Sequence, residues 1–158
     1  MPSNVQSLQD RCAVIHGGRG APGGGVARAF ARERARVFLT GRNRDKLDAV
    51  VRDITQAGGR AQAAVVDALD EAGMLRHAAE VAEQAGGIDL AFNAVGVFHV
   101  QGRPLAELSL EDFFLPIHAY TRSNFLTAKA VAPHMAARGG GVILSVWTLA
   151  SRLPCPRY

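Results

Sequence analysis

The stretch VIHGGRGAPGGGVARAF, residues 14–30, decides the fold, because it joins an apolar β-branched run to a helical pattern through a turn rich in glycine. Its glycines are Gly17, Gly18, Gly20, Gly23, Gly24 and Gly25. Glycine weakens strands and helices alike, so this density needs a separate reason. A glycine turn between a strand and a helix lets the backbone approach a phosphate group and aims the N–H groups of the first helical turn at it.

The composition around this stretch is that of an ordinary folded domain. The chain has 158 residues, of which 48% are hydrophobic and 20% charged, enough for one hydrophobic core and far from the composition of disordered chains. No apolar run behind a basic start has signal-peptide length, and none reaches the length of a membrane span. We therefore expect a single domain over residues 1–158, located in the cytoplasm and with no membrane contact.

Charge and metal-binding side chains exclude two further classes of protein. The net charge is +4, but the arginines are spread along the chain, so nucleic-acid binding is not expected. Cys12 and Cys155 are too few for a disulfide framework and lack zinc-site spacing, so we expect both to be reduced and inert. The histidines at positions 99, 118 and 134 show no ligand spacing, and no metal site is expected.

Short β-branched runs alternate with longer segments of helical period, the pattern of a parallel sheet covered by helices. Strands are predicted at residues 12–16, 35–40, 61–67, 88–93 and 142–147. The first helix is predicted to run for about ten residues from Val26. Later helices are predicted on apolar stripes at Leu47, Val50, Val51 and Ile54, then at Met74, Ala78, Val81 and Ala85, and finally over about 110–138 with bends at Pro116 and Pro133.

The order of these elements predicts an α/β fold with one doubly wound parallel sheet. Because crossover connections between parallel strands are right-handed, the simplest arrangement has strand order 3-2-1-4-5. In such sheets the ligand lies outside the carboxyl ends of the strands, where the strand order reverses. The glycine turn follows the first strand, so it lies at that point.

Two glycine spacings compete within this turn. Gly18, Gly20 and Gly23 satisfy the common G-x-G-x-x-G dinucleotide pattern. Gly17, Ala21 and Gly23 instead match, with one alanine, the G-x-x-x-G-x-G turn of short-chain dehydrogenases/reductases, which this segment resembles. Both spacings place the turn on phosphate, and both remain open; the alternative is a flexible turn that binds no ligand. The candidate phosphate-binding residues are Gly17, Gly18, Arg19, Gly20, Ala21 and Gly23.

Four further segments resemble the same family, so the resemblance covers nearly the whole chain. These are residues 28–43 with the exit TGRN, residues 65–70 (VVDALD), residues 88–96 (IDLAFNAVG) and residues 130–146. The resemblance implies a Rossmann-like, NAD(P)-binding oxidoreductase that moves hydride between the cofactor and an alcohol or carbonyl substrate. It also implies that Asp67 and Ala68 lie at the adenine and that Asn93, Ala94 and Gly96 line the cofactor site.

The end of the second predicted strand bears on the choice of cofactor. An acidic residue there would bind the ribose hydroxyls of NAD, but the sequence has Gly41 followed by Arg42. A guanidinium pairs bidentately with phosphate, so NADP is favoured over NAD, with assistance from Arg44. The alternative is that both arginines are solvated surface charges.

The family's catalytic pair, Tyr-x-x-x-Lys, is absent from these 158 residues. Tyr120 falls where the resemblance places a structural asparagine, and Tyr158 is the last residue. Thr148 aligns with the family's catalytic serine and is the candidate catalytic residue, with a purely structural role as the alternative. His16 stands where the family has threonine, and we expect it to be packed at the end of its strand. The chain is therefore expected to be inactive alone.

In the family, further strands follow the fifth. We therefore expect residues 142–147 to form an exposed edge strand of an incomplete, truncated domain, which invites association between copies, a homo-oligomer included. Three alternatives remain: a non-catalytic nucleotide-binding module, a remnant without a stable fold, and a methyltransferase on a similar sheet. Gly41 argues against a methyltransferase, because the ribose of a methyltransferase cofactor requires an acidic residue at the end of the second strand.

Overall fold

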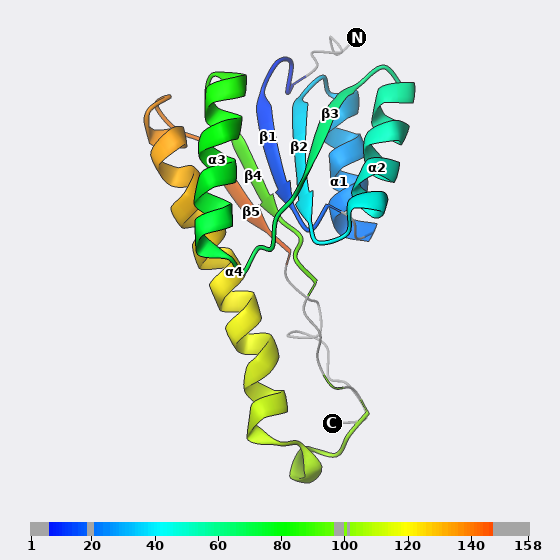
Figure 1. Cartoon of the computed structure of the whole chain (residues 1–158), viewed down its shortest axis with the longest axis vertical. Coiled ribbons are helices and arrows are strands. Elements are labelled where there is room, and N and C mark those ends of the chain that lie inside the picture. The colour runs from blue at the N-terminus through cyan, green and yellow to red at the C-terminus, as the bar shows by residue number, and fades with distance from the viewer. Residues whose placement is uncertain (1–6, 19–20, 97–99, 101, 147–158) are drawn as a thin grey trace, which may run out of the picture.

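The computed structural model describes residues 7–18, 21–96, 100 and 102–146 and has a five-stranded parallel sheet between two layers of helices (Figure 1). The strands are β1 (Cys12–His16), β2 (Arg36–Gly41), β3 (Arg60–Val65), β4 (Leu90–Asn93) and β5 (Val142–Ser145). The helices are α1 (Ala21–Arg32), α2 (Arg44–Gln56), α3 (Glu71–Ala85) and α4 (Leu110–Ala136), with a short 3₁₀ helix, η1 (Leu105–Glu107).

The strand order is β3-β2-β1-β4-β5, and all neighbouring strands are parallel. This confirms the predicted doubly wound sheet. The register aligns the last residue of β1, His16, with Thr40 of β2 and Asn93 of β4. Three strand exits therefore lie at one level, next to the turn that follows β1.

The sheet carries a separate hydrophobic core on each face. Helices α1 and α2 cover one face and α3 and α4 cover the other (Figure 1). Alternate residues of β1 divide between them: Ala13 and Ile15 join the first core, and Cys12 and Val14 join the second. Burial on both faces explains why the central strands are continuously apolar in sequence.

The predicted apolar stripes are confirmed. In α2, Leu47, Val50 and Ile54 are buried, and Val51 packs against the same core. In α3, Met74, Ala78 and Val81 are buried, and Ala85 packs beside them.

The predicted start of the first helix is wrong: α1 begins at Ala21, five residues before Val26. Its first two turns thus contain Gly23 and Gly24, which are buried, and packing there overrides the low helix propensity of glycine. Other boundaries shift by a few residues: β3 ends at Val65, β4 begins at Leu90 and β5 ends at Ser145. Residues 110–136 form one helix that contains both Pro116 and Pro133.

The last strand and the long helix expose apolar side chains. As predicted, β5 lies at an edge of the described sheet, where Val142, Ile143 and Leu144 are 49%, 39% and 44% exposed. The amino-terminal half of α4 extends past the carboxyl edge of the sheet (Figure 1). Within the described ranges, no helix is both long and apolar enough to cross a membrane.

Candidate functional site at the carboxyl edge of the sheet

The glycine turn packs backbone against backbone. Gly17 has a φ of +78°, and a Cβ atom there would lie 2.6 Å from the carbonyl carbon of Ala94. A Cβ atom at Gly23 would lie 3.0 Å from both the carbonyl carbon of Gly17 and Cα of Gly18. Because these neighbours are main-chain atoms, they have little freedom to move aside, and only glycine fits at Gly17 and Gly23.

The glycines of residues 17–25 differ in what a side chain would meet. A Cβ atom at Gly18 would meet the side chain of Leu39, and one at Gly25 would meet nothing within 4 Å. The strict backbone requirement thus falls on Gly17 and Gly23, which both belong to the G-x-x-x-G-x-G spacing. Gly20, on which the competing spacing partly rests, lies outside the described residues, as does Arg19.

Part of the turn's hydrogen-bonding capacity is used within the fold. The N–H groups of Gly17 and Gly18 both donate to the carbonyl oxygen of Thr40, at 3.0 Å each. The first N–H groups of a helix have no partner within that helix, but Pro22, the second residue of α1, has no N–H. In the described part of the turn, the first-turn donors that remain for an anion are the amides of Ala21 and Gly23.

The side chain of His16, the last residue of β1, links β1 to the end of β2 next to the glycine turn. It is 1% exposed, and its Nδ1 lies 2.8 Å from Oγ1 of Thr40, which confirms the prediction of a packed strand-end histidine. Burial, with a smaller contribution from His77, lowers its pKa to about 3. In the described residues Nε2 of His16 has no hydrogen-bond partner, so the ring is held as a neutral group.

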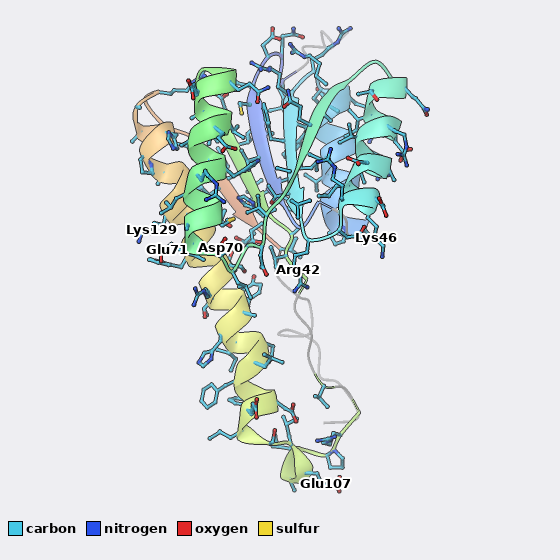
Figure 2. The ribbon with its side chains drawn as sticks, in the orientation of Figure 1. Arg42, Lys46, Asp70, Glu71, Glu107 and Lys129 are labelled. Carbon is cyan, nitrogen blue, oxygen red and sulfur yellow. The ribbon has the colours of Figure 1, made fainter. Side chains whose placement is uncertain are left out.

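The exit of β2 presents positive charge at the same edge. Gly41 is buried and Arg42 is exposed; Figure 2 shows Arg42 at the carboxyl edge and Lys46 near the start of α2. Asn43 caps that helix by accepting from the N–H of Lys46 at 2.9 Å. Arg44 does not share the position of Arg42, because its Nε donates to both carboxylate oxygens of Asp48, at 3.0 and 2.9 Å.

The exit of β3 is a loop held by its own aspartate and by α4. Oδ1 of Asp67 accepts from the N–H of Leu69 at 3.0 Å, and Ala68 is buried with the α3 and α4 core. Arg122 donates through Nε to the carbonyl of Leu69 at 3.0 Å. Beside it, Glu71 and Lys129 form an ion pair of 2.6 Å between α3 and α4 (Figure 2).

The exit of β4 completes the wall of the glycine turn. Asn93 is buried; its Oδ1 accepts from the N–H of Val95 at 3.0 Å and its Nδ2 donates to Oγ of Ser123 at 3.3 Å. The N–H of Ala94 donates to the carbonyl of His16 at 2.8 Å. Gly96 is exposed and open. The structure therefore brings Asn93 and Ala94 together with the turn, while the amide of Asn93 is used to shape the strand exit.

Sequence reasoning missed the residues that tie α4 to the exit of β5. The phenol of Tyr120 donates to the carbonyl oxygen of Val146 at 2.5 Å, and the hydroxyl of Ser145 donates to Oδ1 of Asn124. The available signal was that Tyr120 and Asn124 are polar residues one turn apart on a helix. Thr148 and Tyr158, on which the catalytic expectations rest, lie outside the described residues.

Two further titratable groups are held by their packing in the fold. Cys12 is buried, and burial, followed by the charge of Asp89, raises its pKa to about 12. His118 stacks on Phe114, with ring centroids 5.6 Å apart. Within the described residues, no three His, Cys, Asp or Glu side chains are grouped to hold a metal ion; His99 and Cys155 lie outside them.

Comparison with known proteins gives consistent results. The sequence model of the family "short chain dehydrogenase" matches residues 11–158. A 7alpha-hydroxysteroid dehydrogenase of Clostridium sardiniense is 30% identical over 151 residues, covering 95% of this chain and 58% of that protein. The chain thus spans less than two thirds of this relative.

Two solved structures are similar in fold and differ in their cofactors. A metagenomic short-chain oxidoreductase in complex with NADP has a TM-score of 0.83 and 31% identity, with 94% of this chain and 66% of that chain covered. A 7 alpha-hydroxysteroid dehydrogenase complexed with NADH and 7-oxo glycochenodeoxycholic acid has a TM-score of 0.85 and 28% identity, with 99% and 60% covered.

Proposed function

The chain belongs to the short-chain dehydrogenase/reductase family, and we propose that it binds NADP and transfers hydride between NADP and an alcohol or carbonyl compound. The observation that carries the NADP assignment is Arg42, an exposed guanidinium at the exit of β2. In a doubly wound sheet, this is the position from which a side chain reaches the adenosine ribose. A 2′-phosphate there gains charge-assisted hydrogen bonds from an arginine, whereas a carboxylate would repel it.

The remaining edge fits the rest of a dinucleotide. Gly17 and Gly23 bring no side chain into the turn, so a diphosphate can approach the first-turn amides of α1. We assign the diphosphate to residues 17–23, the adenine to the loop of Asp67 and Ala68, and the middle of the cofactor to Asn93, Ala94 and Gly96. The bound dinucleotide supplies or accepts the hydride.

Thr148 is proposed to donate its hydroxyl hydrogen to the substrate oxygen. In the sequence it follows Ser145, the last residue of β5, by three positions. A second candidate is a nucleotide-binding module without chemistry, which is favoured by the lack of Tyr-x-x-x-Lys in these 158 residues. A phenol needs a nearby cation to act as an acid or base near neutral pH.

Fluorescence titration of the purified chain with NADPH and NADH tests the cofactor assignment. Arg42→Ala should weaken NADPH binding about 10- to 100-fold, because a hydrogen bond to a charged group contributes about 1.5–3 kcal/mol, and should leave NADH binding nearly unchanged. Arg44→Ala is the matched control: it removes an arginine that Asp48 already holds, and we expect a much smaller change. Equal losses for both cofactors in Arg42→Ala would refute the assignment.

Turnover separates the two candidates. Purified chain incubated with NADPH and a panel of ketones and aldehydes, and with NADP and the corresponding alcohols, should change absorbance at the nicotinamide band if it is an oxidoreductase. Cofactor binding without turnover on any of them supports the binding module. If neither cofactor binds, both candidates fail.

A further inference from the structure

Three residues of α4 hold the exits of β4 and β5 together. Asn93 and Ser145 are paired neighbours at the ends of these strands. Asn93 donates to Ser123 at 3.3 Å, the hydroxyl of Ser145 donates to Asn124, and the carbonyl of Val146 accepts from Tyr120 at 2.5 Å. Both exits are therefore attached to one turn of the same helix.

Tyr120 is the centre of this network. Its carbonyl oxygen accepts from Oγ of Ser123 at 3.0 Å and from Nδ2 of Asn124 at 2.9 Å. Its phenol donates to the backbone carbonyl of Val146. One residue thus links the hydrogen bonds that hold β4 to those that hold β5.

The contact of Tyr120 lies at the strands over which the second nucleotide of the cofactor is expected. If Arg42 at the exit of β2 marks the adenosine ribose, the second nucleotide of the dinucleotide lies on the other side of the reversal point, over β4 and β5. Val146 follows β5 and precedes Thr148 by two residues. The carbonyl that Tyr120 holds therefore belongs to the segment that borders the nicotinamide half.

We propose that Tyr120 is a positioning residue for the nicotinamide half of the site: its hydroxyl fixes the exit of β5 against α4 before cofactor and substrate arrive. This inference rests on the proposed function. It gives a role to Tyr120, which stands at the position where the family resemblance places a structural asparagine. The phenol acts through the Val146 carbonyl and exchanges no proton with substrate.

Tyr120→Phe tests the role, because it removes only the hydroxyl. NADPH should bind about two- to tenfold more weakly, the effect of one net hydrogen bond. Adenosine 2′,5′-bisphosphate, which lacks the nicotinamide nucleotide, should bind within twofold of wild type. The matched control is Thr121→Val, which removes a hydroxyl that bonds to the carbonyl of Ile117 in its own helix at 2.7 Å and should change neither affinity.

Amide hydrogen exchange without cofactor provides a second, independent measurement. The N–H of Val146 donates to the carbonyl of Asn93 at 3.0 Å, and its exchange should become several-fold faster in Tyr120→Phe. The N–H of Val66, which bonds to Gly41 at the exit of β3, should keep its rate.

The outcomes separate this inference from the proposed function. Equal weakening of both ligands, or of neither, overturns the positioning role. If wild type binds neither ligand, the proposed function fails, and the exchange experiment alone decides whether Tyr120 anchors the β5 exit: an unchanged Val146 rate overturns it, and a faster rate supports it.

Discussion

The two halves of the carboxyl edge are built from different interactions. On the side of β1 and β2, the turn is shaped by main-chain contacts, with Gly17 and Gly23 packed against carbonyl groups and two N–H groups bonded to Thr40. On the side of β4 and β5, the exits are held by side chains of α4, chiefly Tyr120 and Asn124. The first half depends on the absence of side chains, and the second depends on their presence.

This difference predicts how each half tolerates change. A turn packed backbone against backbone has no space for an added methyl group, because the neighbouring main-chain atoms cannot rotate away. A side-chain network loses one hydrogen bond at a time, each contributing about 0.5–1.5 kcal/mol. Substitutions in the first half should therefore affect folding and binding together, and substitutions in the second should affect binding in small steps.

His16 should give the largest effect, because it is the buried side chain that links the otherwise main-chain half to Thr40. Its pKa in the folded protein is about 3, below the ordinary value of 6.5, so the folded state disfavours the protonated ring. The resulting stability is fully present above pH 6.5 and is lost as the pH falls toward 3, by up to about 5 kcal/mol. Urea unfolding between pH 7 and 4 measures it.

His16→Thr replaces the imidazole with a hydroxyl and should make this pH dependence shallower, with the part that comes from buried His77, whose pKa is also lowered by burial, remaining. His118→Gln, a change at an exposed histidine, should leave the dependence in place. The carboxyl of Asp89 also has a lowered pKa: burial raises it, but hydrogen bonds from the Cys12 N–H and from Arg11 outweigh that effect. Its contribution is lost only below about pH 4. An equally steep dependence in His16→Thr would contradict the assignment to His16.

Gly23→Ala should give the next largest effect and tests the backbone half directly. The added methyl group would meet the backbone of Gly17 and Gly18, so we expect a loss of about 1–3 kcal/mol in unfolding free energy and loss of NADPH binding. Gly25→Ala is the control two residues away: nothing lies within 4 Å of its Cβ position, and it should stabilise α1 by about 0.5–1 kcal/mol. Similar effects at both sites would remove the distinction between these glycines.

Pro22→Ala should give the smallest effect, and in the opposite direction. It restores an N–H group in the first turn of α1, so NADPH binding should tighten by about two- to tenfold. Pro104→Ala, just before η1, is the control and should not change affinity. Unchanged or weaker binding in Pro22→Ala would show that the diphosphate does not use this turn of the helix.

Much of the fold followed from local sequence pattern, because both cores are built from periodic apolar residues. The buried side of α2 could be predicted from the helical spacing of Leu47, Val50 and Ile54. The strand order could be predicted from the alternation of strands and helices and from the right-handedness of crossover connections. The start of α1 did not follow, since Gly23 and Gly24 form helix only because packing against the turn favours it. Tertiary contacts there override propensity.

The two halves of the carboxyl edge also differ in how far they could be predicted from the sequence. The glycine turn and Arg42 could be proposed as candidate site residues from the sequence, because a turn and a strand exit are local in sequence. The bond from Tyr120 to Val146 joins residues 26 positions apart, and that from Asn93 to Ser123 joins residues 30 apart. Nothing in either local pattern specifies the partner, so the side-chain half of the edge emerges only from the folded arrangement.

Cys12, the buried first residue of β1, can report how often the sheet opens. Its thiol is shielded in the central strand and, with a pKa near 12, carries almost no thiolate at neutral pH. An alkylating reagent can reach it only after β1 separates from its neighbours. The rate at which a peptide containing Cys12 acquires the label therefore measures how often the middle of the sheet comes apart, under conditions where the protein is otherwise intact.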